Sequence, residues 1–172
     1  LGGPKFHMVL DVEPILPGED ECAAALRLLG RIRRLYGPRF FDGITADAWY
    51  AKGPFLWAVD KLGWLWIVVL KREDMEIYGE ALQLSRGQKP CVAFRDELRE
   101  RQVQLWEVKD LRFSDGYTKN RPVIVVISDE RWTERRVVGG QKRAKLQQSR
   151  WIWVVCEALG AYLAEVIYQA GH

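Results

Sequence analysis

The stretch FFDGITADAWYAKGPFLWAVDKLGWLWIVVLKRE, residues 40–73, predicts a strand, a helix and a second strand in succession. The first strand, Phe40–Ala46, ends at Asp47. Pro54 then lies in the first turn of the helix, where proline is well tolerated. The second strand, Trp64–Leu70, is apolar at every position, which is typical of a strand that is covered on both faces of a parallel sheet. Two strands joined in this way by a helix run parallel with a right-handed crossover, so the stretch favours an α/β fold.

One strand and two helices are predicted to flank this stretch. Residues 6–16 (FHMVLDVEPIL) are mostly apolar or β-branched and are followed by a Pro-Gly turn, which indicates a strand. Glu19–Tyr36 predicts an amphipathic helix with acids in its first turn, where they suit the helix dipole. Glu73–Leu84 predicts another amphipathic helix. The alternation of three strands with three helices predicts parallel strands with helices packed on the sheet.

The pattern changes at about Cys91 and becomes typical of antiparallel β structure. The segments VQLWEVKDLRF (103–113) and RPVIVVISDE (121–130) predict two strands joined by a hairpin turn at SDGYTKN (114–120). Residues 134–155, with a Gly-Gly turn, add at least one more strand or pair of strands.

The last segment, Cys156–Ala170, predicts a helix because its apolar residues recur at helical spacing. We therefore expect three parts: an α/β core over residues 1–90, a β-rich insertion over 91–155, and a helix over 156–172 that returns to the core.

Composition sets broad limits on function. With 48% hydrophobic and 28% charged residues, the 172-residue chain suits a compact domain, and its net charge of +3 does not by itself indicate a nucleic-acid partner. Three scattered cysteines predict reduced thiols, and two histidines near the ends argue against a histidine-based metal site or triad. No apolar run approaches the roughly 18 residues of a membrane span, so we expect no membrane partner. The chain starts at Leu1 and its first methionine is Met8, which suggests a piece of a longer protein.

Charged residues follow the two strands of the opening stretch. Asp47 follows the first, and Lys71 and Arg72 follow the second. Ligands gather beyond the carboxyl ends of parallel strands, where a carboxylate can hold a divalent cation and bases can bind phosphates. We expect these residues to share one edge of the sheet. Two other interpretations remain open: Asp47 caps the following helix, and Lys71 and Arg72 are simply a solvated strand end.

A basic tract and several tryptophans raise the question of DNA contact. The tract GGQKRAKLQQSR predicts either a loop that binds the DNA backbone or a solvated turn; its basic residues are Lys142, Arg143, Lys145 and Arg150. Trp64 and Trp66 alternate within an apolar run and are predicted to be core residues. The tryptophans of residues 91–155 either stack on DNA or pair within the sheet.

The motif ITADAWYAKGPFLWAVDKLGWLWIVVLKRE resembles the second-aspartate region of DDE-type transposases of bacterial insertion sequences. The upstream segment LDVEPILPGEDECAAALRLLGRI resembles the strand, turn and helix before that aspartate. The β-rich stretch before SRWIWVV resembles the insertion that precedes the catalytic glutamate in such transposases. The resemblance is specific around Asp47 and loose across Cys91–Val155.

This resemblance implies a ribonuclease-H-like mixed sheet flanked by helices, with an antiparallel β insertion. It implies an enzyme that binds Mg²⁺ or Mn²⁺ and cleaves and transfers DNA strands, with Asp47 as catalytic residue and metal ligand. Double-stranded DNA, both transposon ends and target, would be the partner, and the protein would form a homodimer in the transposition complex. It would act in the bacterial cytoplasm at the nucleoid. Lys71, Arg72 and the basic residues of 142–150 would contact DNA phosphates.

The other two acids of the family are not matched in this chain. Asp11 lies too close to Asp47 and on the wrong strand for the first acid, and Glu165 lacks the Arg-Trp-x-x-Glu context of the glutamate. We therefore expect the metal to bind only in a longer parent protein, and the chain alone to be inactive. The alternative is a non-catalytic remnant of a mobile element that binds DNA or another partner.

Overall fold

The computed structural model describes residues 2–3, 6–7, 9–71, 75–112, 122–138, 141–159 and 166–168. In this part of the chain the protein is an α/β protein with four helices and a six-stranded mixed sheet. The helices are α1 (Glu21–Tyr36), the short 3-10 helix η1 (Ala48–Tyr50), α2 (Gly53–Lys61) and α3 (Glu76–Ser85). The sheet strands are β3 (Gly43–Ala46), β4 (Leu65–Val69), β5 (Val92–Asp96), β6 (Arg101–Leu111), β7 (Val123–Val138) and β8 (Gln141–Cys156), in the spatial order β3-β4-β8-β7-β6-β5. A separate two-stranded pair joins β1 (Gly2–Gly3) to β2 (Phe6–His7).

The β3-α2-β4 unit confirms the strand, helix, strand order and the parallel pairing predicted from the opening stretch. However, β4 is fully buried on one face only, because Trp66 and Val68 are buried and the alternate residues are half-buried. β3 and β4 are parallel, with Gly43 opposite Leu65 and Ala46 opposite Val68. Pro54 lies in the first turn of α2. The chain leaves α2 through Gly63, whose φ of 77° is a left-handed conformation that glycine adopts without strain. The predicted core tryptophans, Trp64 and Trp66, are both 2% exposed, which confirms their assignment to the core.

The antiparallel strands of residues 91–155 belong to the same sheet as β3 and β4. β8 pairs antiparallel with β4, Val69 lying opposite Trp153, and β7, β6 and β5 follow by further antiparallel pairing. Hydrogen bonding in the sheet thus continues across residue 90, where the sequence indicated a change of pattern. The predicted hairpin turn at 114–120 lies outside the described residues, although the two strands that it joins, β6 and β7, do pair.

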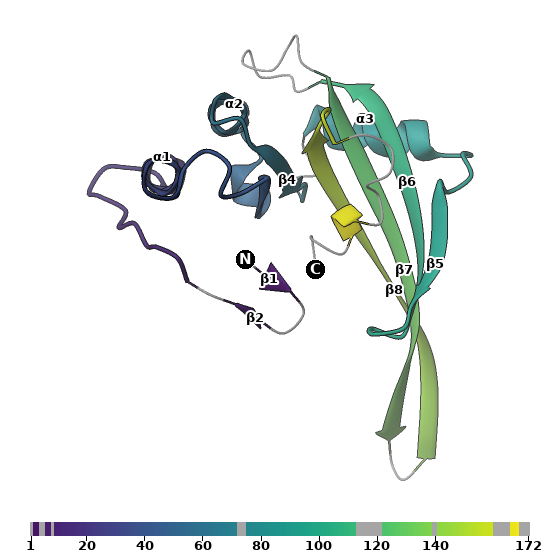
Figure 1. Ribbon diagram of the computed structural model, residues 1–172. Coiled ribbons are helices and arrows are strands. Elements are labelled where there is room, and N and C mark those ends of the chain that lie inside the picture. Colours follow the sequence, from purple (N-terminus) through teal and green to yellow (C-terminus); the bar gives the residue numbers. More distant parts are fainter. Residues whose placement is uncertain are drawn as a thin grey trace.

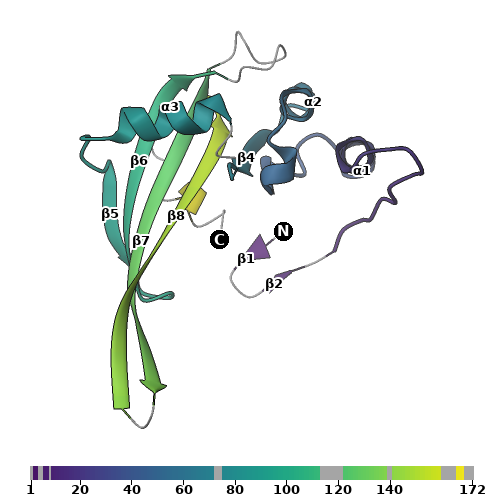
Figure 2. The ribbon, with the colours of Figure 1, turned by 180° about the vertical axis from the view of Figure 1, so that it is seen from behind.

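The far end of the sheet narrows to two strands. The pairing of β6 with β7 extends from Leu111 to Gln102, which lies opposite Arg131, whereas β7 and β8 remain paired as far as Val138 and Gln141. Trp132–Val138 of β7 and Gln141–Gln147 of β8, called here the β7–β8 ribbon, therefore project beyond the sheet (Figures 1 and 2).

The predicted first strand over Phe6–Leu16 is wrong for most of its length. Only Phe6–His7 are in a strand, and residues 9–16 are not in the six-stranded sheet. This segment is held against α1 by ion pairs instead: Glu13 binds Arg27 and Arg31, and Asp11 binds Arg31. The β-branched composition indicates an extended backbone, but a strand also requires a partner strand. The parallel pair β3–β4 is thus not joined by a third parallel strand among the described residues.

The predicted helix over Cys156–Ala170 also needs correction at its start. Cys156 is the last residue of β8, and residues 157–159 form a turn and bend. Val166–Tyr168 are helical, and the rest of the predicted helix lies outside the described residues.

The hydrophobic core lies between the sheet and its helices. Buried side chains of α2 and α3, such as Leu56 and Ala81, join those of β4, β6, β7 and β8. Helix α3 lies across one face of the sheet (Figures 1 and 2). None of the helices in the described part of the chain is long and apolar enough to cross a membrane.

Candidate nucleic-acid interface

Asp47 lies at the carboxyl end of β3 and is exposed. Its Oδ1 accepts a hydrogen bond from the backbone N–H of Trp49 at 2.6 Å, so Asp47 is the N-cap of η1. An aspartate suits this position because its side chain satisfies a backbone donor at the start of a helix. One of the two interpretations left open by the sequence, a helix cap, is therefore observed. A cap uses one carboxylate oxygen and leaves the charge at the sheet edge.

The surroundings of Asp47 come from α1 and η1. The Tyr50 hydroxyl donates a hydrogen bond to Oε1 of Glu21 at 2.8 Å. Burial raises the pKa of Tyr50, and the hydrogen bond and charge of Glu21 and the charge of Asp47 raise it further, so the phenol stays protonated. Lys52 Nζ lies 3.9 Å from Oδ2 of Asp20 and 3.9 Å from the centroid of the Trp49 ring. The acids near Asp47 therefore already have hydrogen-bond or ionic partners.

The described residues do not assemble a complete metal site around Asp47. A divalent ion in a phosphoryl-transfer site is held by several oxygen ligands, and two-metal sites use several acids. No group of three or more His, Cys, Asp or Glu side chains among the described residues could hold a metal ion. Asp47 is one carboxylate, with one oxygen engaged by Trp49. It could contribute a ligand only together with acids from elsewhere.

Lys71 lies beyond the carboxyl end of the neighbouring strand, β4. It follows β4, which is parallel to β3, so Lys71 and Asp47 lie beyond the same edge of the sheet, as predicted. Its Nζ lies 5.6 Å from the centroid of the Trp151 ring, within the range of a cation–π contact. Arg72, predicted beside it, lies outside the described residues.

A cleft of about 470 Å³ adjoins Lys71, called here the Lys71 cleft. Its charged and aromatic lining comes from five elements or their ends: Lys71, Tyr78, Arg101, Trp132, Arg150 and Trp151. Two of the residues predicted to contact DNA, Lys71 and Arg150, are therefore brought to one cleft. Arg150 Nη2 lies 3.7 Å from Oδ2 of Asp129, at the opposite position of β7. Cations beside aromatic rings can bind both the backbone and the bases of a nucleic acid.

The remaining predicted residues lie on the ribbon. Arg143 and Lys145 are exposed, and Lys142 lies opposite Val137, with its side chain outside the described part of the structure. The tract was predicted as a loop or a solvated turn, but residues 141–150 form part of strand β8. The structure thus divides the basic residues into two sets, one at the Lys71 cleft and one on the ribbon.

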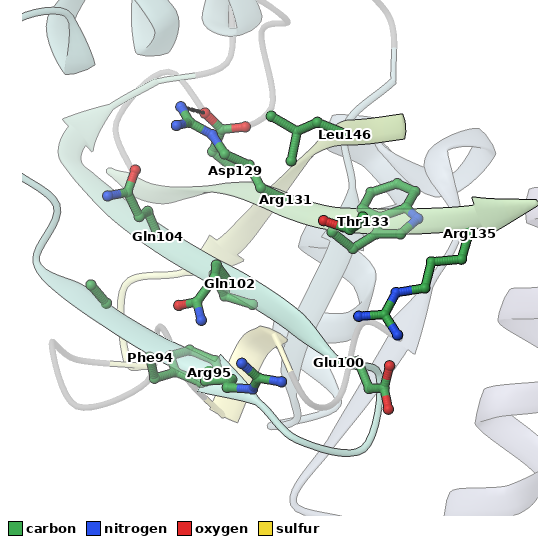
Figure 3. A pocket seen from close by; sticks show the side chains of 13 residues that line it. Phe94, Arg95, Glu100, Gln102, Gln104, Asp129, Arg131, Thr133, Arg135 and Leu146 are labelled. Carbon is green, nitrogen blue, oxygen red and sulfur yellow. Dashed lines mark hydrogen bonds and ion pairs between the residues drawn. The ribbon is translucent and has the colours of Figure 1, made fainter. Parts of the chain in front are cut away.

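Sequence reasoning missed a larger cleft of about 1020 Å³ on the face of β5–β8, called here the polar cleft (Figure 3). It is lined by the arginines Arg95, Arg131 and Arg135 and by the glutamines Gln102 and Gln104, among other residues. Arg131 Nη2 lies 3.5 Å from Oδ2 of Asp129. Figure 3 shows Arg135 extending toward Glu100. These side chains occupy alternate positions of their strands. A polar residue at every second position of β6 and β7 was therefore the sequence signal that could have predicted the cleft.

Arg101 and Trp132 were also missed. Arg101 forms an ion pair with the buried Glu130 and lies over the ring of Trp132, with its Cζ 4.3 Å from the ring centroid. The residues belong to β6 and β7, and the sequence carries no local signal that pairs them.

In comparisons with known proteins, the chain matches no protein-family model and no curated protein.

Proposed function

We propose that this chain is part of the catalytic region of a DDE-type transposase, with a ribonuclease-H-like core and a β-rich insertion. The parent enzyme would cleave and transfer strands of double-stranded DNA. One observation carries the proposal: Asp47 and Lys71 follow the two parallel strands β3 and β4 and therefore lie beyond the same sheet edge. An acid and a base at one edge of the sheet suit phosphodiester chemistry, and the sequence around Asp47 supplies the family resemblance.

The open edge of β3 supports the same proposal. β3 is the outermost strand of the sheet in the described part of the chain. A further parallel strand paired there would end beside Asp47 and could bring a second carboxylate to it. The proposal needs such acids, because the described residues alone do not fit a divalent metal site. A role for Mg²⁺ or Mn²⁺ is therefore proposed only for the parent protein.

The basic residues support double-stranded DNA as the partner. Lys71 and Arg150 line one cleft, and Arg143 and Lys145 are exposed on the ribbon. In the parent, these residues would neutralise phosphates of the bound DNA. The homodimer and the bacterial, nucleoid-associated location follow from the family resemblance and are part of the proposal.

The first test is to read the DNA on both sides of this reading frame. The proposal expects an upstream strand that ends in aspartate, a downstream Arg-Trp-x-x-Glu motif, and flanking inverted repeats. The absence of both acids in frame would contradict it. The second test is strand cleavage by the parent protein carrying Asp47→Asn, which should be abolished. Normal cleavage by this variant would overturn the assignment of Asp47.

A second candidate is a DNA-binding remnant of a mobile element without catalytic activity. Two observations favour it: no cluster of metal-ligating side chains is found among the described residues, and the basic residues lie on exposed strands. Stop codons or frameshifts on either side of the reading frame, together with duplex binding by the chain itself, would support this candidate over the enzyme.

A further inference from the structure

The β7–β8 ribbon carries a strong positive charge. Its two strands and their connection, residues 132–147, contain five Lys or Arg residues and a single acid, Glu134. Arg135, Arg143 and Lys145 are exposed, and Leu146 beside them is 68% exposed. The acid has a local partner, since its Oε2 accepts a hydrogen bond from Nε2 of Gln147 at 2.8 Å.

The register of the ribbon contains one pair of directly opposed basic residues, near the opposite-charge pair Glu134 and Lys145. Arg136 of β7 lies directly opposite Arg143 of β8. Like charges at directly opposed positions of an antiparallel pair destabilise it. A polyanion bound along the ribbon would offset such repulsion, so this pairing is compatible with an anionic partner.

The ribbon projects from the same edge of the sheet as the one beyond which Asp47 and Lys71 lie. β8 is antiparallel to β4, and Val69 at the end of β4 lies opposite Trp153. Followed from Trp153 toward lower residue numbers, β8 reaches the ribbon at Gln147. Gln147 lies about 20 Å from Trp153 at a rise of roughly 3.3 Å per residue. The Lys71 cleft, with Arg150, lies along this path. A rod-like ligand on the ribbon could therefore reach the Asp47 edge across the cleft.

We propose that the β7–β8 ribbon lies in the major groove of double-stranded DNA and holds the duplex against the Asp47 edge. A two-stranded antiparallel ribbon has strands about 4.8 Å apart and fits the major groove of B-form DNA, which is about 12 Å wide. The major groove of A-form RNA is deep and narrow and does not admit such a ribbon. The choice of duplex DNA rests on the ribbon alone, whereas delivery to Asp47 rests on the proposed function.

The first experiment measures binding of a short fluorescent DNA duplex to the chain at several salt concentrations. The ribbon variant Arg135→Gln/Arg143→Gln/Lys145→Gln removes three charges from exposed side chains. We expect it to weaken binding by roughly tenfold or more, and to reduce the slope of log affinity against log salt by about 2 to 3, since each phosphate contact contributes about 0.9.

The matched control is Arg33→Gln/Arg34→Gln/Arg39→Gln, which removes the same charge from the end of α1 and the loop after it. We expect the control to keep most of the affinity and the salt slope. Equal losses in the two triple variants would show that binding depends on overall charge and would overturn the proposal. Circular dichroism and urea unfolding confirm that both variants are folded.

The second experiment tests the groove. Dimethyl sulfate methylates N7 of guanine, which faces the major groove. We expect the wild-type chain, but not the ribbon variant, to protect these positions. We also expect double-stranded RNA and single-stranded DNA of the same sequence to bind roughly tenfold more weakly. Unprotected N7 atoms, or equal affinity for either competitor, would overturn the proposal.

Failure of this inference can be told apart from failure of the proposed function. Loss of duplex binding in the ribbon variant, with normal cleavage by the Asp47→Asn parent, would keep the ribbon inference and overturn the assignment of Asp47. Normal duplex binding by the ribbon variant, with abolished cleavage by Asp47→Asn, would overturn the ribbon inference and keep the assignment of Asp47.

Discussion

Arg101 of β6 and Glu130 of β7 form an ion pair across neighbouring strands, with the Glu130 side chain completely buried. The same guanidinium lies over the ring of Trp132, the first residue of the β7–β8 ribbon. Burial of a carboxylate is costly unless it is paired and hydrogen-bonded. Arg101 therefore both neutralises a buried charge and fixes the base of the ribbon to the body of the sheet.

Arg101→Gln should lower the free energy of unfolding by about 3 kcal/mol, because it removes the countercharge from a buried carboxylate. Urea unfolding followed by tryptophan fluorescence measures this. The double variant Arg101→Met/Glu130→Met should recover most of the loss, since replacing a buried ion pair by apolar residues is often neutral. A loss below about 1 kcal/mol in Arg101→Gln would contradict the importance of the pair.

Gly43 is required by the close approach of β3 to β4. A Cβ atom at this position would lie 2.7 Å from the carbonyl oxygen and 2.9 Å from Cβ of Leu65. Gly43→Ala should therefore destabilise the protein by about 1–3 kcal/mol, as overpacking does in a close-packed interior. Gly30→Ala is the matched control, because nothing lies within 4 Å of a Cβ at this position in α1. It should stabilise the protein by about 0.5–1 kcal/mol, and equal effects of the two changes in thermal unfolding would refute the argument.

The local sequence pattern was sufficient to predict the β3-α2-β4 unit, α1 and α3, because the apolar residues of each recur with a clear period and the ends carry recognisable residues. It failed for residues 9–16, where an extended backbone is held by Asp11 and Glu13 on arginines of α1 instead of by a partner strand. The residues of one apolar segment do not indicate whether it pairs with a distant strand.

The candidate site was predictable only in part, for the same reason. Asp47 and Lys71 follow strands that are adjacent in the chain, so their shared edge could be deduced from element order. Arg101, Trp132 and Arg150 meet through the register of β6, β7 and β8. Register depends on backbone hydrogen bonds and turn lengths, and a slip of one residue would turn each side chain to the other face.

Two substitutions of Asp47 separate its structural role from its charge. Asparagine caps a helix about as well as aspartate, so Asp47→Asn should leave the unfolding free energy within about 0.5 kcal/mol of wild type. Asp47→Ala removes the bond to the Trp49 N–H and should cost about 0.5–1 kcal/mol. Chemical denaturation of the two variants side by side checks this. A large loss of unfolding free energy in Asp47→Asn would mean that the effect of this substitution on cleavage by the parent reflects lost stability and not only lost charge.

Asp96 forms the centre of a buried polar network at the end of β5. Its side chain accepts hydrogen bonds from the Arg99 backbone at 3.1 Å, the Arg99 guanidinium at 2.9 Å and the Tyr168 hydroxyl at 3.1 Å. Burial raises the pKa of Asp96, but the bonds from Arg99 and Tyr168 outweigh it, and the pKa lies below its ordinary value of 3.8.

A carboxyl group with a lowered pKa in the folded state stabilises the protein above its unfolded pKa, and this stabilisation is lost as the pH falls through the folded value. As the pH falls below about 4, the ordinary pKa of an aspartate, the unfolding free energy of Asp96→Asn should therefore fall less steeply than that of wild type. Tyr168→Phe should lose about 1 kcal/mol at neutral pH and show an intermediate slope, because one of the bonds that lower the pKa of Asp96 is gone. Tyr36→Phe, at a position that is 44% exposed, should keep the wild-type slope. Urea titrations at each pH measure all four proteins, and parallel slopes for wild type and Asp96→Asn would show that this network does not contribute to acid sensitivity.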